Sequence, residues 1–382
     1  MYEQPSSEAI LFFMLYAGVA VLSAVASFYL LFRRANALAP DVKSSVCLRR
    51  WTGLFFAVIA LSHAWYMPIL SSKTADGVMQ SYMIGGILDC LTVLPLSMVV
   101  MLSMLQDRRR PLWTPWILVA PLVAGLVLCA IRGNDALLPV LLGYFLILGM
   151  GFAIYMLCAV RQYGRWLRDN YADLEHKELW KSFMVLIITL LFFGIYASDV
   201  RGPLYKYAVQ LSDVVVVCFL LWRVETLSDL CIQPTTPTTS KEVLPAAETV
   251  KETRSRPIVQ DNIGPLLQTH CVDTKLYLQH DITLQQLAKA IGINRYYLSQ
   301  HFSRQGTTYN AYINDLRINH FVRLYREVVS SHHPFTAMQL AQDSGYSSYS
   351  TFSLAFKQRM GQNVTEWMQH TKSLGMADEA DA

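Results

Sequence analysis

The chain has 382 residues, of which 53% are hydrophobic and 16% charged, and its formal net charge is +4. Soluble globular proteins carry about 25% charged residues, so this composition excludes an ordinary soluble globule as well as a disordered or fibrous chain. The seven cysteines form no CxxC pair and have no neighbouring set of histidines. They predict reduced thiols, with neither a zinc site nor a disulfide framework. No cofactor is expected.

Apolar stretches of about 20 residues, the length that crosses the hydrocarbon core of a bilayer as a helix, recur up to Arg223. The first is preceded by Glu3 and Glu8 instead of a basic segment and is too long for the core of a signal peptide, so we expect it to remain as an anchor. The pattern predicts seven transmembrane helices, at residues 9–32, 51–70, 79–105, 112–131, 137–160, 182–198 and 203–222.

Lysine and arginine are unevenly distributed between alternate loops. Thirteen lie between residues 33 and 50, 108 and 110, and 161 and 181, against three or four on the other side, at Lys73, Arg132, Arg201 and, inside the last span, Lys206. Basic loops remain on the cytoplasmic side of a membrane. This asymmetry predicts a protein of the bacterial inner (cytoplasmic) membrane, with its N-terminus outside and everything after Arg223 in the cytoplasm.

Three ionisable residues fall inside the predicted spans. Asp89 lies in the third, Asp213 in the seventh and His63 near the outer end of the second. Ionisable groups are costly in lipid, which makes these residues candidates for a ligand or signal site between spans. The alternative is a structural role, in which each group is neutral or hydrogen-bonded to a neighbouring helix. No pattern of nucleophile, base or metal ligands appears, so we expect no enzyme.

Residues 224–260 are rich in proline, threonine and charge and have no sustained apolar period, which predicts a flexible linker. An alternative for its first residues is a short dimerising coil that continues the seventh span through Val224, Leu227, Leu230 and Cys231. Residues 373–382 predict a disordered acidic tail.

Residues 261–372 contain an internal repeat. In the first copy, apolar or small residues stand at 284, 287, 288 and 291 and are followed by Gly292, and in the second they stand at 337, 340, 341 and 344 and are followed by Gly345. Each copy predicts a helix, a glycine turn and a second helix, which is a helix-turn-helix unit. Residues 307–327 lack proline and glycine and predict one long helix between the units. At 1.5 Å per residue, about 20 residues cover roughly 30 Å, close to one turn of B-DNA.

The apolar positions of each second helix determine which residues it exposes. Leu298 and Phe302 face inward in the first unit, as do Phe352 and Phe356 in the second, so the polar residues between them face outward. Arginine and glutamine suit base edges, while residues near helix ends suit phosphates. The alternative for each is a solvated helix face. The predicted DNA-contacting residues are Arg295, Tyr296, Ser299, Gln300 and Arg304 in the first unit, and Tyr349, Ser350, Ser353, Leu354 and Lys357 in the second.

The segment TLQQLAKAIGINRYYLSQHFSRQGTTYNAYINDLRINHFVRLYRE, followed by LAQDSGYSSYSTFSLAFKQRMGQNVTEW, resembles the AraC/XylS-type DNA-binding domain. The resemblance covers about residues 261–372, through both helix-turn-helix units and the linking helix with Arg317 and Ile318. This chain departs from the family at Phe321, where a small alanine is usual, at Leu354, where a basic residue is common, and at Val364, where a proline usually follows. The resemblance implies a transcription regulator in which the spans replace the usual N-terminal ligand-binding or dimerisation module.

The sequence therefore predicts an all-α protein. A seven-helix transmembrane bundle (1–223) and a linker (224–260) precede a cytoplasmic domain (261–372) with two helix-turn-helix units joined by a long helix, and the tail (373–382) follows. The expected function is membrane-anchored, sequence-specific regulation of transcription. The alternative is a seven-span receptor or transporter whose helix-turn-helix domain binds another protein. The expected partners are double-stranded promoter DNA, membrane lipid and an unidentified signal ligand, with RNA polymerase and a second copy of the chain as further candidates.

Overall fold

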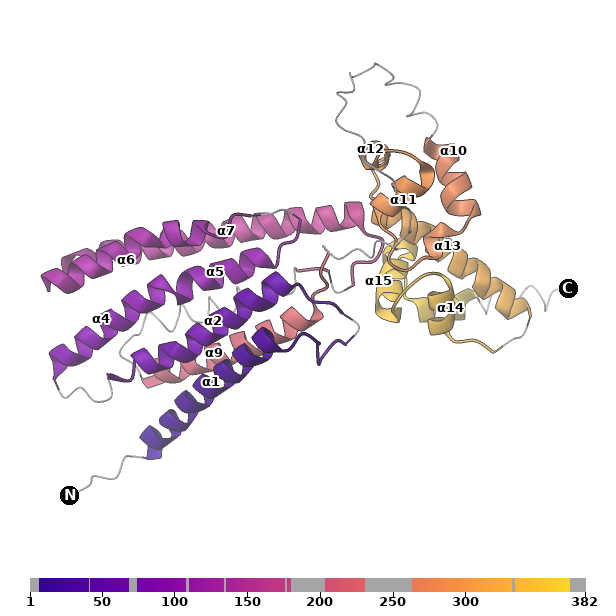
Figure 1. Cartoon of the computed structure of the whole chain (residues 1–382). Helices are drawn as coiled ribbons and strands as arrows, with labels where there is room; N and C mark the ends of the chain where they lie inside the picture. The colour runs from indigo at the N-terminus through magenta and orange to yellow at the C-terminus, as the bar shows by residue number, and fades with distance from the viewer. Residues whose placement is uncertain are drawn as a thin grey trace, which may run out of the picture. The chain divides into compact units, whose positions relative to one another are not determined.

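A computed structural model describes residues 7–40, 42–68, 74–107, 110–133, 135–175, 177–179, 203–230, 263–331 and 334–371. All the regular elements within these ranges are helices, which confirms the predicted all-α class (Figure 1). The chain divides into two compact units. The first comprises Met1–Gly164 and His176–Thr235, and the second comprises Arg165–Glu175 and Thr236–Ala382.

The described helices of the first unit overlap six of the seven predicted spans. Among the described residues, five helical segments are long and apolar enough to cross a membrane: Ser7–Phe32, Asp76–Ser103, Thr114–Arg132, Leu138–Asn170 and Lys206–Thr226. The predicted span at 51–70 coincides with a helix outside this set of five, and the predicted span at 182–198 lies outside the described residues. The helices are α1 (Ser7–Phe32), α2 (Val46–Trp65), α4 (Ala75–Leu91), α5 (Val93–Ser103), α6 (Thr114–Arg132), α7 (Leu138–Asn170) and α9 (Pro203–Thr226), with a 3-10 turn η1 (Asp135–Leu137) before α7.

The third predicted span consists of two helices, α4 and α5, because the helix is interrupted at Thr92. Its backbone leaves the helical region, at φ −122° and ψ −62°, and its side-chain hydroxyl donates to the carbonyl of Leu88 at 2.6 Å. Pro95 has no N–H to donate to Leu91, and its ring crowds that carbonyl. The break therefore follows from Pro95, while both halves remain apolar enough to continue one crossing.

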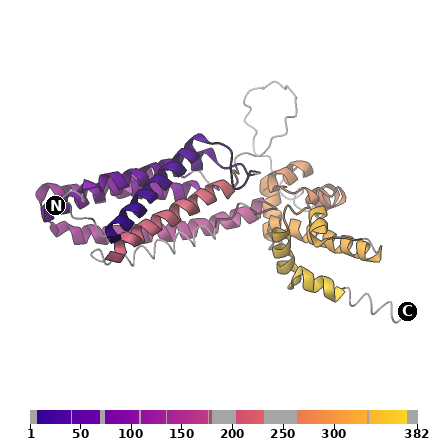
Figure 2. The same ribbon diagram turned by 90° about the horizontal axis from the view of Figure 1, so that it is seen from below.

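Helices of the first unit pack closely where side chains are small. α1 packs on α2 and α9, and these three helices lie side by side in Figure 1 and in the perpendicular view of Figure 2. Gly53 permits the approach of α2 to α1, because a Cβ at this position would lie 2.8 Å from Leu31 Cγ. Ser27 Oγ donates to the Gly53 carbonyl at 2.7 Å. Such small-residue contacts and interhelical hydrogen bonds are typical of helix packing in lipid.

The alternative in which a dimerising coil continues the seventh span does not fit the structure. Helix α9 ends at Thr226, and Val224 and Leu227 are fully buried in the first unit, so neither side chain is available to a second copy. The backbone after α9 is bonded to other parts of the same unit. Asp229 N donates to the Lys43 carbonyl at 2.7 Å, and Leu230 N donates to Gln106 Oε1 at 2.8 Å. The remainder of the predicted linker, from residue 231, lies outside the described residues.

The second unit has two hydrophobic cores that share one helix. Tyr309 and Ile313 of the long helix α13 enter the first core, and Ile318, Phe321 and Tyr325 of the same helix enter the second. The predicted helix between the repeats is thus confirmed, although it extends to Ser330. The elements are α10 (Ile263–Leu267), a π-helical turn η2 (Gln268–Asp273), η3 (Leu276–Leu278), α11 (Leu284–Ile291), α12 (Arg295–Arg304), α13 (Tyr309–Ser330), α14 (Ala337–Asp343) and α15 (Tyr349–Met360), before a last helical stretch at 364–371.

Two of the departures from the family pattern fill the second core. Phe321 is fully buried, with its ring centroid 4.5 Å from that of Phe352 and 5.7 Å from that of Phe356. Val364 is 2% exposed in the same core. A large side chain at 321 is therefore accommodated by aromatic packing.

Arg317 connects the two halves of the second unit from the middle of α13. Its side chain is 1% exposed. Its Nε donates to the Tyr277 carbonyl at 2.8 Å, and its Nη2 donates to the carbonyls of Gln279 at 2.8 Å and His280 at 3.0 Å. The guanidinium also lies 5.4 Å from the ring centroid of Tyr346 in the second half. The pKa of Arg317 is lowered by burial, and these carbonyls and the ring stabilise its charge.

Candidate functional site

The first helix-turn-helix unit consists of α11 and α12. Helix α11 begins with a capping box, in which Thr283 and Gln286 satisfy each other's backbone N–H groups, and ends at Gly292, whose φ is 78°. Helix α12 is capped by Asn294, whose side chain accepts from the N–H of Tyr296 at 2.9 Å. Caps at both helix starts and a left-handed residue between them fix the turn locally.

The outward face of α12 carries the residues predicted to contact DNA. Arg295, Tyr296 and Arg304 are exposed, the Tyr296 side chain at 66%, whereas Ser299 and Gln300 are half-buried. Leu298 and Phe302 are buried in the first core, as predicted. An arginine and an aromatic residue in the first turn of a helix-turn-helix recognition helix are placed where such helices approach base edges.

The second unit repeats this geometry with α14 and α15. Thr336 and Gln339 form the capping box of α14, and Ser348 caps α15 by accepting from Thr351 N at 3.3 Å. Phe352 and Phe356 are buried as predicted. Among the predicted contacts, Ser350, Leu354 and Lys357 are exposed and Ser353 is half-buried. Tyr349 is half-buried because its ring packs on Phe352, with centroids 5.7 Å apart.

Two acidic residues of the first unit lie around one cavity. Asp89 of α4 and Asp213 of α9 both line a largely apolar space of about 530 Å³. Asp89 accepts hydrogen bonds from Trp65 Nε1 at 3.2 Å and from Tyr66 OH at 2.7 Å. These two donors were not identified from the sequence, because no local pattern links them to residue 89. A cavity of this volume with few polar groups has the dimensions of a small-molecule site.

His63, the third predicted residue, has other partners. It is 5% exposed and does not line the cavity. Its Nδ1 lies 2.8 Å from the Ile59 carbonyl and its Nε2 lies 3.0 Å from Gln210 Oε1. The structure therefore brings Asp89 and Asp213 to one site, and it places His63 in a hydrogen-bonded position beside it. In the part of the chain that the structure describes, no group of three or more histidine, cysteine or acidic side chains is positioned to hold a metal ion.

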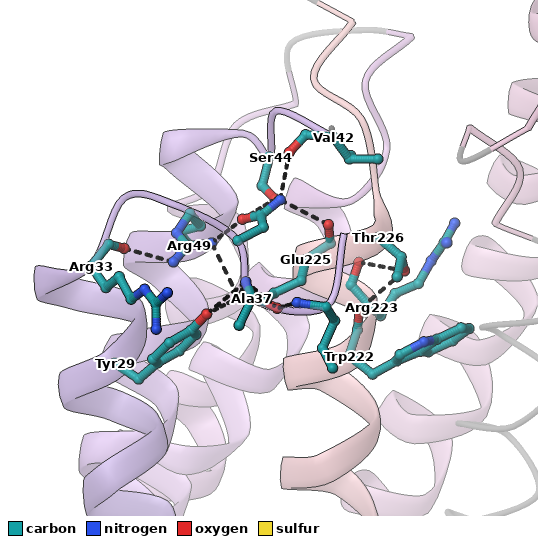
Figure 3. Close-up of polar contacts among 12 residues, drawn as sticks. Tyr29, Arg33, Ala37, Val42, Ser44, Arg49, Trp222, Arg223, Glu225 and Thr226 are labelled. Atoms are coloured by element: carbon teal, nitrogen blue, oxygen red, sulfur yellow. Dashed lines mark hydrogen bonds and ion pairs between the residues drawn. The ribbon is translucent and has the colours of Figure 1, made fainter. Parts of the chain in front are cut away.

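A buried polar cluster joins the end of α9 to the loop between α1 and α2 (Figure 3). Glu225 accepts from Tyr29 OH and from the N–H groups of Ala37 and Leu38, the latter two at 3.1 and 2.8 Å. Arg49 lies 4.0 Å from the same carboxylate. The C-terminal end of α9 is thereby fixed to α1, to α2 and to the loop between them.

The comparisons with known proteins concern the second unit. A family model described as a helix-turn-helix domain matches residues 287–370. Curated proteins and solved structures gave no match. The matched residues begin within α11 and end in the last helical stretch, so they include the recognition helices of both units. Residues 287–370 are therefore a helix-turn-helix domain of the AraC type, the type that the sequence resembles.

Proposed function

We propose that this chain is a membrane-anchored transcription regulator that binds promoter DNA sequence-specifically and couples this binding to a signal received by its first unit. One observation carries the proposal. Two helix-turn-helix units with capped recognition helices share a single rigid helix, α13, between their cores. Phosphate contacts from helix ends and base contacts from exposed side chains are the general means by which such units bind a duplex.

The membrane location rests on the apolar surfaces of the first unit. Met14 and Val25 of α1 are 68% and 60% exposed, and Val140 and Ile147 of α7 are 67% and 73% exposed. Apolar faces of this extent are unusual on a soluble protein and suit contact with lipid. We propose seven spans in the inner membrane, with the N-terminus outside and the helix-turn-helix domain in the cytoplasm. The reason is that thirteen lysine and arginine residues lie in the loops on one side of the spans, against three or four on the other.

DNA binding is tested with the full chain in lipid nanodiscs and the duplex upstream of its own coding sequence, against a scrambled duplex over a salt series. Specific binding that weakens steeply with salt is expected. We compare the affinity for the upstream duplex with the affinity for the same duplex carrying one replaced base pair. At one base position, Arg295→Ala should reduce the preference for the original base pair by about 1–3 kcal/mol, which lowers the ratio of the two affinities. This ratio does not depend on how much of the protein is able to bind.

The matched control for that substitution is Arg326→Ala, which removes the same charge from an exposed position of α13. It should leave the ratio unchanged. Salt-insensitive binding, or equal ratios for Arg295→Ala and the unmodified chain, would contradict a DNA-contacting role for α12 and would favour the protein-binding alternative.

We propose that the signal is an amphiphile with an apolar body and a cationic group. The lining of the cavity is apolar except at a few residues such as Asp89, Ser212 and Asp213, and a carboxylate surrounded by apolar groups selects a positive partner. Dodecylamine should raise the melting temperature of the full chain in nanodiscs more than dodecanol does. Asp213→Asn should remove most of this difference, since a hydrogen bond to a charged group contributes about 1.5–3 kcal/mol.

The control for the cavity is Asp76→Asn, because Asp76 is exposed in the first turn of α4. It should retain the amine-dependent shift, and neither substitution should change DNA affinity in the absence of dodecylamine. Equal shifts with the amine and the alcohol would assign the two carboxylates a structural role instead.

A further inference from the structure

A short segment of the second unit comes from a distant part of the sequence. Residues 165–175 belong to this unit, and Ala172 is 1% exposed within the first core. Ala172 N donates to the Ile282 carbonyl at 3.3 Å, and Tyr171 forms an isolated β-bridge with Thr283. Asn310 Nδ2 donates to the carbonyls of Tyr171 and Ala172 at 3.2 and 2.6 Å. The segment is therefore bound through its backbone and an apolar side chain.

The polar side chains of the same segment bind both recognition elements. Asn170 accepts a hydrogen bond from Arg295 in the first turn of α12. Asp173, which is 5% exposed, accepts from the Ser347 hydroxyl beside the cap of α15. The four residues from Asn170 to Asp173 thus reach from one helix-turn-helix unit to the other.

Glu175 completes the contact with the second unit. Its carboxylate accepts from Thr351 Oγ1 at 3.1 Å, within the first turn of α15. Its N–H donates to Asp173 Oδ1 at 2.9 Å, so the two acidic residues hold each other in place. Two carboxylates therefore lie at the N-terminal end of a recognition helix.

This position conflicts with a bound duplex. The N-terminal ends of recognition helices enter the major groove, and hydroxyls and N–H groups there bind DNA phosphates. The segment places acidic oxygens against these hydroxyls and engages Arg295, which we expect to contact a base. DNA phosphates and these carboxylates are both negatively charged and accept hydrogen bonds from the same donors. They therefore cannot occupy the recognition face at the same time.

We propose that residues 170–175 are an internal competitor of DNA, which binds the recognition face of the helix-turn-helix domain and must leave before both recognition helices contact a duplex. This inference rests on the proposed DNA-binding function, and it names the partner that occupies the same face when DNA is absent. The segment suits this role because the carboxylates of Asp173 and Glu175 accept from hydroxyls at the start of α15, which are donors of the kind that bind phosphates.

The first test measures DNA affinity of the full chain in nanodiscs. Asp173→Ala removes the acceptor for Ser347 and should raise the affinity for upstream DNA at least fivefold. Asp169→Ala is the matched control, since it removes the same charge four residues earlier from an exposed side chain. It should change affinity by less than twofold. If both substitutions raised the DNA affinity equally, the change in net charge alone would explain the increase, and the inference would be overturned.

The second test fixes the segment in place. In the full chain with Asp173→Cys and Ser347→Cys, a short bis-maleimide should join the two positions, and a protease site inserted near residue 242 should yield two fragments that remain linked. The cross-linked protein should lose at least tenfold in DNA affinity. The two single-cysteine variants, treated identically, account for reaction of the native cysteines. Burial raises the pKa of the Cys271 thiol to about 11, so this residue should react slowly.

The outcomes separate the inference from the proposed function. The inference would be overturned if the double-cysteine variant gave no more cross-linked product than the single-cysteine variants. It would also be overturned if the cross-linked protein bound DNA as tightly as the protein that is not cross-linked. Failure of every form, including Asp173→Ala, to prefer upstream over scrambled DNA would overturn the DNA-binding function, whatever the cross-linking shows.

Discussion

Arg317→Met is expected to destabilise the second unit by about 3–5 kcal/mol, because the buried carbonyl of Tyr277 and the partly buried carbonyls of Gln279 and His280 lose their donor at once, and an unsatisfied buried group costs about 1–3 kcal/mol. The affected acceptors, at Tyr277, Gln279 and His280, lie outside α13, so methionine at 317 can fill the volume without replacing the bonds. Amide hydrogen exchange of the full chain in nanodiscs should show the loss as reduced protection throughout α11, α12 and α13.

Arg323→Ala on the same helix is the control for that experiment. Arg323 is 55% exposed, with its Nε 3.7 Å from Glu327 and its Nη2 2.8 Å from His320 Nδ1, and contacts of an exposed arginine of this kind contribute only a few tenths of a kcal/mol each. Protection should therefore remain within about 0.5 kcal/mol of the unmodified chain. A similarly small effect of Arg317→Met would show that the buried guanidinium does not hold the two halves together.

Gly345→Ala is expected to cost about 2–4 kcal/mol, for two reasons that act together. The φ of Gly345 is 90°, in the left-handed region that favours glycine. A Cβ at this position would lie 2.8 Å from both Cα and the carbonyl oxygen of Leu278, and backbone atoms cannot swing aside. Hydrogen exchange should lose protection in α14 and α15.

Gly361→Ala separates the two reasons. Gly361 has a φ of 75° but no atom within 4 Å of the added Cβ, so only backbone strain remains and the expected loss is about 1 kcal/mol. Equal losses at both positions would mean that the contact with Leu278 relaxes at little cost.

Local patterns were sufficient to predict the helix-turn-helix units. The i, i+3, i+4, i+7 spacing from Leu284 to Ile291 puts one apolar face on a helix, and Asn294 and Ser348 supply caps that need no distant partner. Burial of Leu298 and Phe302 follows from the same periodicity. These features depend on residues within about two helical turns of each other, which is the range over which a sequence pattern is informative.

Contacts between distant residues could not be predicted in the same way. Nothing near Asn170 indicates that it meets Arg295, 125 positions later, and nothing near Trp65 and Tyr66 indicates that they donate to Asp89. The end of α7 was missed for a related reason. Hydrophobicity delimits the part of a helix that suits lipid, whereas the backbone continues to Asn170 through charged residues that also favour helix.

The shared helix α13 has a consequence for the sequences that this protein can bind. Because α13 enters both cores, the separation of α12 and α15 is set within one chain and not by pairing of two identical chains. A dimer of single helix-turn-helix units requires a palindromic target that mirrors its two-fold axis. Here the two recognition helices differ in sequence, so a single chain should meet two successive groove faces with different side chains, and its targets should be asymmetric and have a direction along the promoter.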